Sequence, residues 1–272
     1  MRIPGLAIIG ASLLALAGCA SLPLPQERRA AADVLAARQG WVATTFQAGA
    51  FNLAVWLPPR IVAADELTIY LEGDGLAWIA SDAPSADPTP TRSTGLQLAL
   101  AQPEGNAAYL ARPCQYVTSA NCGQRYWTTD RFAPEVITAT NQAVESLKAR
   151  FGARRLNLVG YSGGAAVAAL LAARRDDVAR LVTVAGNLDH RAWTTLHRLT
   201  PLAGSLNPAN DKATLASIRQ WHFVGADDHV VPPALAQNFV ANMTSARVIV
   251  LDGYGHTCCW AENWSGLWRG LH

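Results

Sequence analysis

Short β-favouring segments alternate with helix-favouring segments through most of the 272-residue chain. The strand-like runs are nearly continuous in apolar residues, as in Leu67–Leu71, Leu156–Val159 and Leu181–Ala185. Such runs are typical of strands buried on both faces of a parallel sheet, because a half-exposed strand would alternate polar and apolar residues. Helix-like segments lie between them, for example over 134–150 and 164–174. The alternation predicts an α/β fold, in which a mostly parallel central sheet carries helices on both faces.

Weaker signals extend this pattern toward the C-terminus. Further strands are expected at 107–111, 221–224 and 248–251, and further helices at 96–101, after Pro233 and at the end of the chain. The looser segment 187–217 is short for a cap domain, so we expect a minimal cap. Its large apolar residues recur at spacings of three and four, which favours a helix packed on the core over the lining of an acyl pocket. They are Trp193, Leu196, Leu199 and Leu202.

Composition excludes several classes of function. The chain is 50% hydrophobic and 15% charged, the reverse of the balance that keeps a chain disordered. Its net charge of +2, without a basic cluster, provides no electrostatic surface for nucleic acid. No G-x-G-x-x-G or Walker motif is present, and no Cys-x-x-Cys pairs with a histidine cluster. We therefore expect neither a cofactor nor a metal.

The first residues indicate export. Arg2 precedes an uncharged apolar run, Leu6–Ala17, that is too short to cross a bilayer as a stable helix. The run ends in Leu-Ala-Gly-Cys19, which resembles the bacterial lipobox, whereas an ordinary signal or a buried helix with an incidental cysteine is the alternative. The expected organisation is a lipoprotein signal peptide at 1–18, a tether at 19–40 and one domain at 41–272. Lipid on Cys19 would anchor the protein to a membrane. Because Ala20 rather than an aspartate follows, the resemblance to Gram-negative lipoproteins implies the outer membrane, facing the periplasm.

The cysteine count of five is then accounted for, since one is used for lipid and four remain. An oxidising compartment favours disulfides among those four. Cys114 and Cys122 flank a short polar loop and are the expected pair. Cys258 and Cys259 are adjacent, and three states stay open for them: a vicinal bridge, bonds to other cysteines, or free thiols.

A G-x-S-x-G motif occurs at Gly160–Gly164, with Ser162 at its centre. A predicted strand precedes it and a predicted helix follows it, which is the strand-turn-helix setting of a nucleophile elbow. Glycines suit this turn because the serine backbone is strained and its neighbours must approach adjacent elements closely. The alternative, a glycine turn that merely joins strand and helix, leaves the serine without a role. We expect Ser162 to be a catalytic nucleophile.

An acid and a histidine follow in chain order. The segment Gly225–Pro232 reads G-x-x-D-x-x-V-P after a predicted strand, and Gly253–His256 reads G-x-G-H after the last one. Together with the elbow, these motifs resemble those of the α/β-hydrolases over roughly residues 65–270. The resemblance implies a Ser-His-Asp triad of Ser162, His256 and Asp228.

Both assignments involve a choice. The spacing within the acid motif falls on Asp228, with the adjacent Asp227 as the alternative. His222 lies within a predicted strand, where a packed neutral histidine is expected, and His229 is too close to the acid to bridge it to the serine. We therefore predict that His256 is the base, in preference to the other five histidines: His190, His197, His222, His229 and His272.

The oxyanion hole needs two preorganised donors. One is expected at the backbone N–H of Gly163, directly after the nucleophile. Glu72-Gly73-Asp74-Gly75 resembles the His-Gly-x-Gly turn of the family, with Glu72 in place of histidine, so the backbone N–H of Asp74 is the expected second donor. This departure brings two carboxylates near a developing anion. Their side chains should therefore point away or pair with a cation, for which Arg125 and Arg131 are the candidates.

These features predict a serine hydrolase that cleaves an ester or related acyl bond of a small-molecule or lipid substrate. Two alternatives stay open. The first is a non-catalytic envelope-binding lipoprotein on the same fold, and the second is a peptidase or acyltransferase that uses the same triad. Aromatic residues do not decide between them, because we expect Tyr126, Trp127 and the tryptophans of the last helix to be structural.

Overall fold

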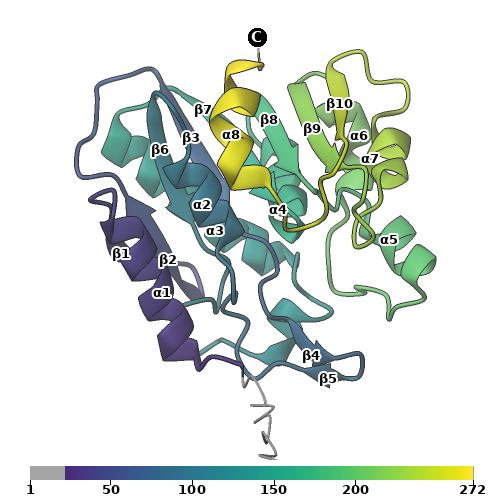
Figure 1. The fold of residues 1–272 in the computed structure, drawn as a ribbon, viewed down its shortest axis with the longest axis horizontal. Helices are drawn as coiled ribbons and strands as arrows, with labels where there is room; N and C mark the ends of the chain where they lie inside the picture. The colour runs from purple at the N-terminus through teal and green to yellow at the C-terminus, as the bar shows by residue number, and fades with distance from the viewer. Residues whose placement is uncertain (1–21, 272) are drawn as a thin grey trace, which may run out of the picture.

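A computed structural model describes residues 22–271, so the expected signal peptide at 1–18, Cys19 and His272 lie outside the described residues. An eight-stranded sheet forms the centre of the fold, in the order β1-β2-β6-β3-β7-β8-β9-β10 (Figure 1). From β6 to β10 in this order every neighbouring pair is parallel, which confirms the expected α/β architecture. The strands are β1 (Val42–Ala48), β2 (Phe51–Leu57), β3 (Glu66–Leu71), β6 (Asn106–Leu110), β7 (Arg155–Tyr161), β8 (Val178–Val184), β9 (Arg219–Gly225) and β10 (Ala246–Leu251).

The apolar runs form the middle of this sheet. In β3 and β7, which are neighbours, Ile69 pairs with Leu158 and Leu71 pairs with Gly160. Both strands are buried along almost their whole length. Because all strands from β6 to β10 run the same way, their carboxyl ends and the loops that follow meet at one edge of the sheet, where α/β folds bind ligands.

The sheet also contains an antiparallel part that the sequence pattern did not reveal. Strands β1 and β2 form a hairpin closed by Gly49 and Ala50, and β2 pairs antiparallel with β6. Gly49 adopts a positive φ of 53°, which a two-residue hairpin turn requires. The hairpin lies at the end of the sheet away from β10 (Figure 1).

Helices cover both faces of the sheet. The buried residues of α3, α4 and α7 share one hydrophobic core, whereas those of α1, α2 and α8 share a second core on the other face. Figure 1 shows α2 and α8 in front of the sheet. The helices are α1 (Pro25–Ala37), α2 (Thr94–Leu100), α3 (Pro134–Phe151), α4 (Gly163–Ala172), α5 (His190–His197), α6 (Lys212–Leu215), α7 (Pro233–Val240) and α8 (Trp260–Arg269).

Helix α1 falls within the segment expected to be a tether, and it packs on the domain. Ala32 and Ala36 are buried in the core shared with α2 and α8. The buried guanidinium of Arg28 donates to the backbone carbonyl of Thr89 and pairs with Asp87 at 3.4 Å. This helix is therefore joined by polar contacts to the loop that precedes α2.

The remaining segments are short. A small hairpin of β4 (Trp78–Ala80) and β5 (Ala83–Pro84) follows β3, and the 3-10 helix η1 (Gln124–Trp127) precedes α3. Between β8 and β9 lie only α5, α6 and the 3-10 helix η2 (Pro208–Asp211), which fits a minimal cap. Among residues 22–271, no helix is both long and apolar enough to cross a membrane.

All four cysteines of the described region form disulfides. Cys114 is bonded to Cys122, as the sequence predicted. Cys258 and Cys259 are bonded to each other, which selects the vicinal bridge from the three states left open.

Candidate active site

Ser162 stands at a sharp turn between β7 and α4. Its φ of 50° and ψ of −120° lie outside the ordinary regions for a residue with a side chain. A Cβ at Gly160 would lie 2.4 Å from the Cα of Ala165, and one at Gly164 would lie 2.4 Å from the carbonyl oxygen of Leu71. The glycines of the motif are therefore required by close backbone approach, and the turn has the geometry of a nucleophile elbow.

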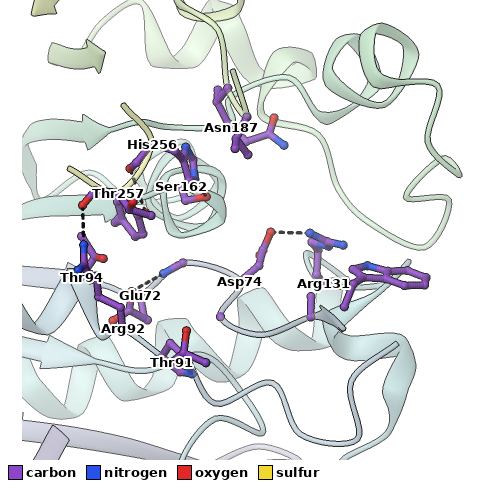
Figure 2. Close-up of a pocket in the computed structure, with 18 of the residues that line it drawn as sticks. Glu72, Asp74, Thr91, Arg92, Thr94, Arg131, Ser162, Asn187, His256 and Thr257 are labelled. Atoms are coloured by element: carbon purple, nitrogen blue, oxygen red, sulfur yellow. Dashed lines mark hydrogen bonds and ion pairs between the residues drawn. The ribbon is translucent and has the colours of Figure 1, made fainter. Parts of the chain in front are cut away.

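The structure brings Ser162 together with His256 and Asp228, although these residues are far apart in the chain. The Nε2 atom of His256 lies 2.9 Å from the Oγ of Ser162, and its Nδ1 lies 2.8 Å from the Oδ2 of Asp228. Both distances are those of hydrogen bonds. The imidazole thus connects the hydroxyl to the carboxylate in the arrangement of a Ser-His-Asp triad (Figure 2 shows His256 beside Ser162).

Asp228, rather than its neighbour Asp227, faces the histidine. Asp228 is 2% exposed, and its Oδ1 accepts hydrogen bonds of 2.8 Å from the backbone N–H groups of Val230 and Val231. These bonds fix the carboxylate so that its other oxygen is aimed at His256. Asp227 is exposed, and its backbone N–H donates to the carbonyl of Tyr254, which ties together the loops of Asp228 and His256.

The loop of His256 is held from two sides. Its carbonyl oxygen accepts a hydrogen bond of 3.1 Å from the hydroxyl of Tyr161 and one of 3.0 Å from the indole N–H of Trp260. Burial raises the pKa of Tyr161 well above its usual value, so the hydroxyl keeps its proton and acts as a donor. Tyr161, the residue before Ser162, and Trp260 at the start of α8 therefore both hold the loop of His256 in place.

The 72–75 turn lies directly against the elbow. A Cβ at Gly73 would lie 3.3 Å from the Cβ of Ser162, and a Cβ at Gly163 would lie 2.1 Å from the Oδ1 of Asp74. The N–H of Gly73 already donates to the Oε1 of Glu72 at 3.0 Å. Within residues 22–271, the backbone N–H groups of Asp74 and Gly163 have no acceptor.

Glu72 is buried and receives three hydrogen bonds. Besides the Gly73 N–H, the N–H of Gly95 donates to it at 3.1 Å and the hydroxyl of Tyr109 at 2.9 Å. Burial raises the pKa of this carboxyl above its usual value despite those bonds, because the apolar surroundings disfavour the charged form. Glu72 therefore anchors the turn through its side chain, in the position where the family pattern has a histidine.

Asp74 is paired with two arginines. Its Oδ2 lies 2.5 Å from a guanidinium nitrogen of Arg131, and its Oδ1 lies 3.2 Å from one of Arg112. Burial raises its pKa, but the charges of Arg131 and Arg112 outweigh that effect and hold the pKa below its usual value. Of the two cations proposed from sequence, Arg131 is thus the one at Asp74. The expectation for Arg125 is wrong, because Arg125 pairs with Asp130 and Glu135.

A cavity of about 330 Å³ opens beside Ser162 and is walled by the 72–75 turn, the loop around Arg92, and Asn187 (Figure 2). Asn187 is buried, and its Oδ1 has no hydrogen-bond partner among the described residues. Its backbone N–H donates to the carbonyl of Ser162 at 3.1 Å, which places the residue next to the nucleophile. Asn187 and Arg112 were missed by sequence reasoning, because each lies in a segment without a recognisable motif.

The expectation that the apolar residues of segment 187–217 pack on the core is wrong for most of them. Leu196 is 55% exposed and Leu199 is 45% exposed. Trp193 is half-buried and lines the Ser162 cavity. Only Leu202 is buried as expected, because the period of an amphipathic helix does not tell whether its apolar face meets a core or a cavity.

The other four histidines among residues 22–271 make no hydrogen bond to Ser162. His222 is fully buried, with its Nδ1 2.8 Å from the hydroxyl of Thr183, and burial lowers its pKa to about 3. His190 is buried beside Phe132, His197 contacts the carbonyl of Val230, and His229 is exposed. Over the described part of the chain, no group of three or more His, Cys, Asp or Glu side chains is placed to hold a metal ion.

The arrangement of strands and loops is that of the α/β-hydrolase fold, and solved structures share it. A lipase-named protein from Acinetobacter baumannii aligns with a TM-score of 0.63 at 12% identity, over 93% of this chain and 97% of its own. An esterase from Pyrococcus furiosus aligns with a TM-score of 0.60 at 12% identity, covering 91% and 94%. A serine hydrolase without a lid from Xanthomonas campestris aligns with a TM-score of 0.55 at 14% identity, covering 85% and 91%.

The sequence comparisons give a different result. No protein-family model matches the chain, and no curated protein sequence matches it. At 12–14% identity the structural likeness concerns the fold, so the chemistry has to be argued from the site itself.

Proposed function

We propose that this protein is a serine hydrolase that cleaves a carboxylic ester or a related acyl bond, with Ser162 as nucleophile, His256 as base and Asp228 as its partner. The observation that carries the proposal is the pair of hydrogen bonds of 2.9 Å and 2.8 Å that join the three side chains. The strained backbone of Ser162 supports it, because such strain is concentrated at functional sites.

The reaction follows from the roles of the three groups. As the Ser162 oxygen attacks the carbonyl carbon, His256 takes the hydroxyl proton through Nε2. Asp228 accepts the hydrogen bond from Nδ1, which keeps the imidazole in the correct tautomer and stabilises the imidazolium. His256 then gives the proton to the leaving oxygen. A water molecule, activated by the same base, releases the acyl group from Ser162.

The negative charge on the carbonyl oxygen needs donors that are in place beforehand. We assign this role to the backbone N–H groups of Gly163 and Asp74. Their lack of other acceptors supports the assignment, as does the close approach of the 72–75 turn to the elbow. The two arginines at Asp74 leave a net positive charge there, so the carboxylate does not oppose the developing anion.

A fluorophosphonate probe tests the proposal, because it reacts covalently with activated serines. The protein should be labelled, Ser162→Ala should not, and the exposed control Ser146→Ala should be labelled at the native rate. Folded protein, verified by circular dichroism, that neither takes up the probe nor hydrolyses any of a panel of acyl esters would contradict the proposal and favour a binding module. Peptide substrates and acyl acceptors in the same panel separate hydrolysis of esters from peptidase and acyltransferase activity.

We also propose that Cys19 is lipidated and that the protein is held at the outer membrane, facing the periplasm. The support is the sequence of the export signal and the residue after the cysteine. Metabolic labelling with an alkyne fatty acid should mark the protein, and Cys19→Ser should abolish the mark and release the chain from the membrane fraction. Equal labelling of both forms would contradict this localisation.

A further inference from the structure

A second cavity, of about 460 Å³, adjoins the one at Ser162. We call it the side cavity. The β4–β5 hairpin forms one wall, and the segment from Trp193 to Leu202 forms the wall opposite. More than half of its lining residues are apolar: Trp78, Ile79, Ala80, Pro84, Trp193, Leu199 and Leu202.

The two cavities are adjacent and share part of their walls. Trp78, Trp193 and Arg131 line both of them, so the side cavity begins where the cavity at Ser162 ends. The mouth of the side cavity is also apolar, since Trp78, Ile79 and Leu199 are 39%, 57% and 45% exposed. We call these three residues the apolar rim. Exposed apolar side chains around a concave site are typical of ligand-binding surfaces.

The side cavity lies on the oxyanion side of the nucleophile. Figure 2 shows Asp74 and Arg131 on one side of Ser162 and Arg92 and Thr257 on the other, beside His256. The leaving oxygen must lie at His256, which protonates it, whereas the acyl carbon stays bonded to Ser162 with its oxygen near the 72–75 turn. The alcohol then lies toward the polar His256 side, and the acyl chain, the remaining substituent of the carbonyl carbon, is free to extend into the apolar side cavity.

We propose that the side cavity is an acyl-chain subsite and that the substrate is an ester of a medium- or long-chain fatty acid, oriented with its alcohol toward Arg92. This inference rests on the proposed function, because it requires an acyl group on Ser162. An acyl chain that lies between Trp78, Trp193 and Leu202 is removed from contact with water along most of its length. Each methylene buried in this way raises kcat/KM by up to about fourfold.

Two series of esters test the inference. The first lengthens the acyl part, from p-nitrophenyl acetate to butyrate, hexanoate and octanoate, with a constant leaving group. The second lengthens the alcohol, from ethyl to octyl acetate. We expect kcat/KM to rise steeply along the first series and to change less than threefold along the second, because only the acyl part enters the side cavity.

Two variants in the wall of the side cavity test whether the preference for long acyl chains depends on this cavity. Leu199→Asp puts a charge into the side cavity, and Ala80→Trp fills it. Both residues are exposed, so the fold should tolerate either change. Each should lower the ratio of octanoate to acetate kcat/KM by at least tenfold. Val62→Asp, at an exposed apolar residue outside both cavities, should leave the ratio unchanged.

The outcomes separate the two proposals. Hydrolysis of acetate without a gain along the acyl series overturns the acyl-chain subsite and leaves the serine hydrolase intact. A gain along the acyl series that Leu199→Asp and Ala80→Trp do not reduce also overturns it, because the chain then lies elsewhere. Absence of both turnover and fluorophosphonate labelling overturns the proposed function, and the subsite with it.

Discussion

The residues around Ser162 and the apolar rim are neighbours, yet they are built in opposite ways. The triad and the 72–75 turn, which we call the catalytic floor, contain buried and half-buried polar groups held by specific hydrogen bonds, such as those at Asp228. The rim consists of exposed apolar side chains in the short strand β4 and in the loop after α5. Under the proposed function the two regions have different tasks: the floor fixes the positions of the reacting atoms, and the rim provides apolar surface without fixing geometry.

The largest effect on activity should come from a substitution at Asp228, the acid that we assign to the triad. Asp228→Asn keeps the size of the side chain but removes the charge that stabilises the imidazolium and selects its tautomer. We expect kcat to fall by about 10⁴-fold with little change in KM. Steady-state kinetics on an ester of suitable chain length measures both. The exposed control Asp227→Asn should retain most of the activity, and equal losses in the two variants would contradict the assignment of the acid.

The buried ion pair between Asp74 and Arg131 should contribute to the stability of the fold. Arg131→Ala leaves the Asp74 carboxylate with Arg112 alone, and loss of a partner from a buried pair costs about 3 kcal/mol of unfolding free energy. Urea denaturation measures this cost. Arg154→Ala breaks an exposed pair with Asp65 and should leave the midpoint unchanged. Similar midpoints for the two variants would show that the pair at Asp74 is not needed to hold the floor.

A third effect concerns the pH dependence of stability and involves His222 in strand β9. Because burial lowers the pKa of His222 to about 3, from 6.5, the unfolded chain binds a proton between these values that the folded protein does not. The free energy of unfolding therefore falls as pH drops below 6.5, by about 3 kcal/mol at pH 4. His222→Asn should weaken this dependence in urea unfolding at pH 7 and pH 4. The exposed control His229→Asn should not, and identical slopes for all three proteins would refute the explanation.

Asn187 tests whether the floor has another polar contact with substrate. Its amide oxygen has no hydrogen-bond partner among residues 22–271 and the residue lines the cavity, so truncation to alanine should cost the equivalent of one hydrogen bond to substrate. We expect kcat/KM to fall about tenfold. Asn238→Ala, at an exposed position, serves as the control. Unchanged kinetics in Asn187→Ala would assign the residue a structural role through its backbone only.

The smallest effect should come from the rim. Ile79→Ala removes an exposed side chain and should change the unfolding free energy by less than about 0.5 kcal/mol. Ile69→Ala, in the fully buried strand β3, should cost about 2–5 kcal/mol. Chemical denaturation of the two variants measures this difference in unfolding free energy between the rim and the core. A large loss in Ile79→Ala would show that the rim is part of the packed core.

The sequence predicted those features that depend on local patterns. The parallel strands, the elbow and the two loops of the acid and base were recognisable, because each is a short motif beside an apolar run. The pairing of Arg112 with Asp74 joins residues 38 positions apart and has no local signature. The β1–β2 hairpin was missed because its strands are interrupted by a turn of only two residues, and periodicity there is weak.

Helix α1 is connected to one wall of the Ser162 cavity. Arg28 holds Thr89 and Asp87, and the next residues of that loop, Thr91 and Arg92, form a wall of the Ser162 cavity. Movement of α1 would therefore shift the wall past which we propose that the alcohol leaves.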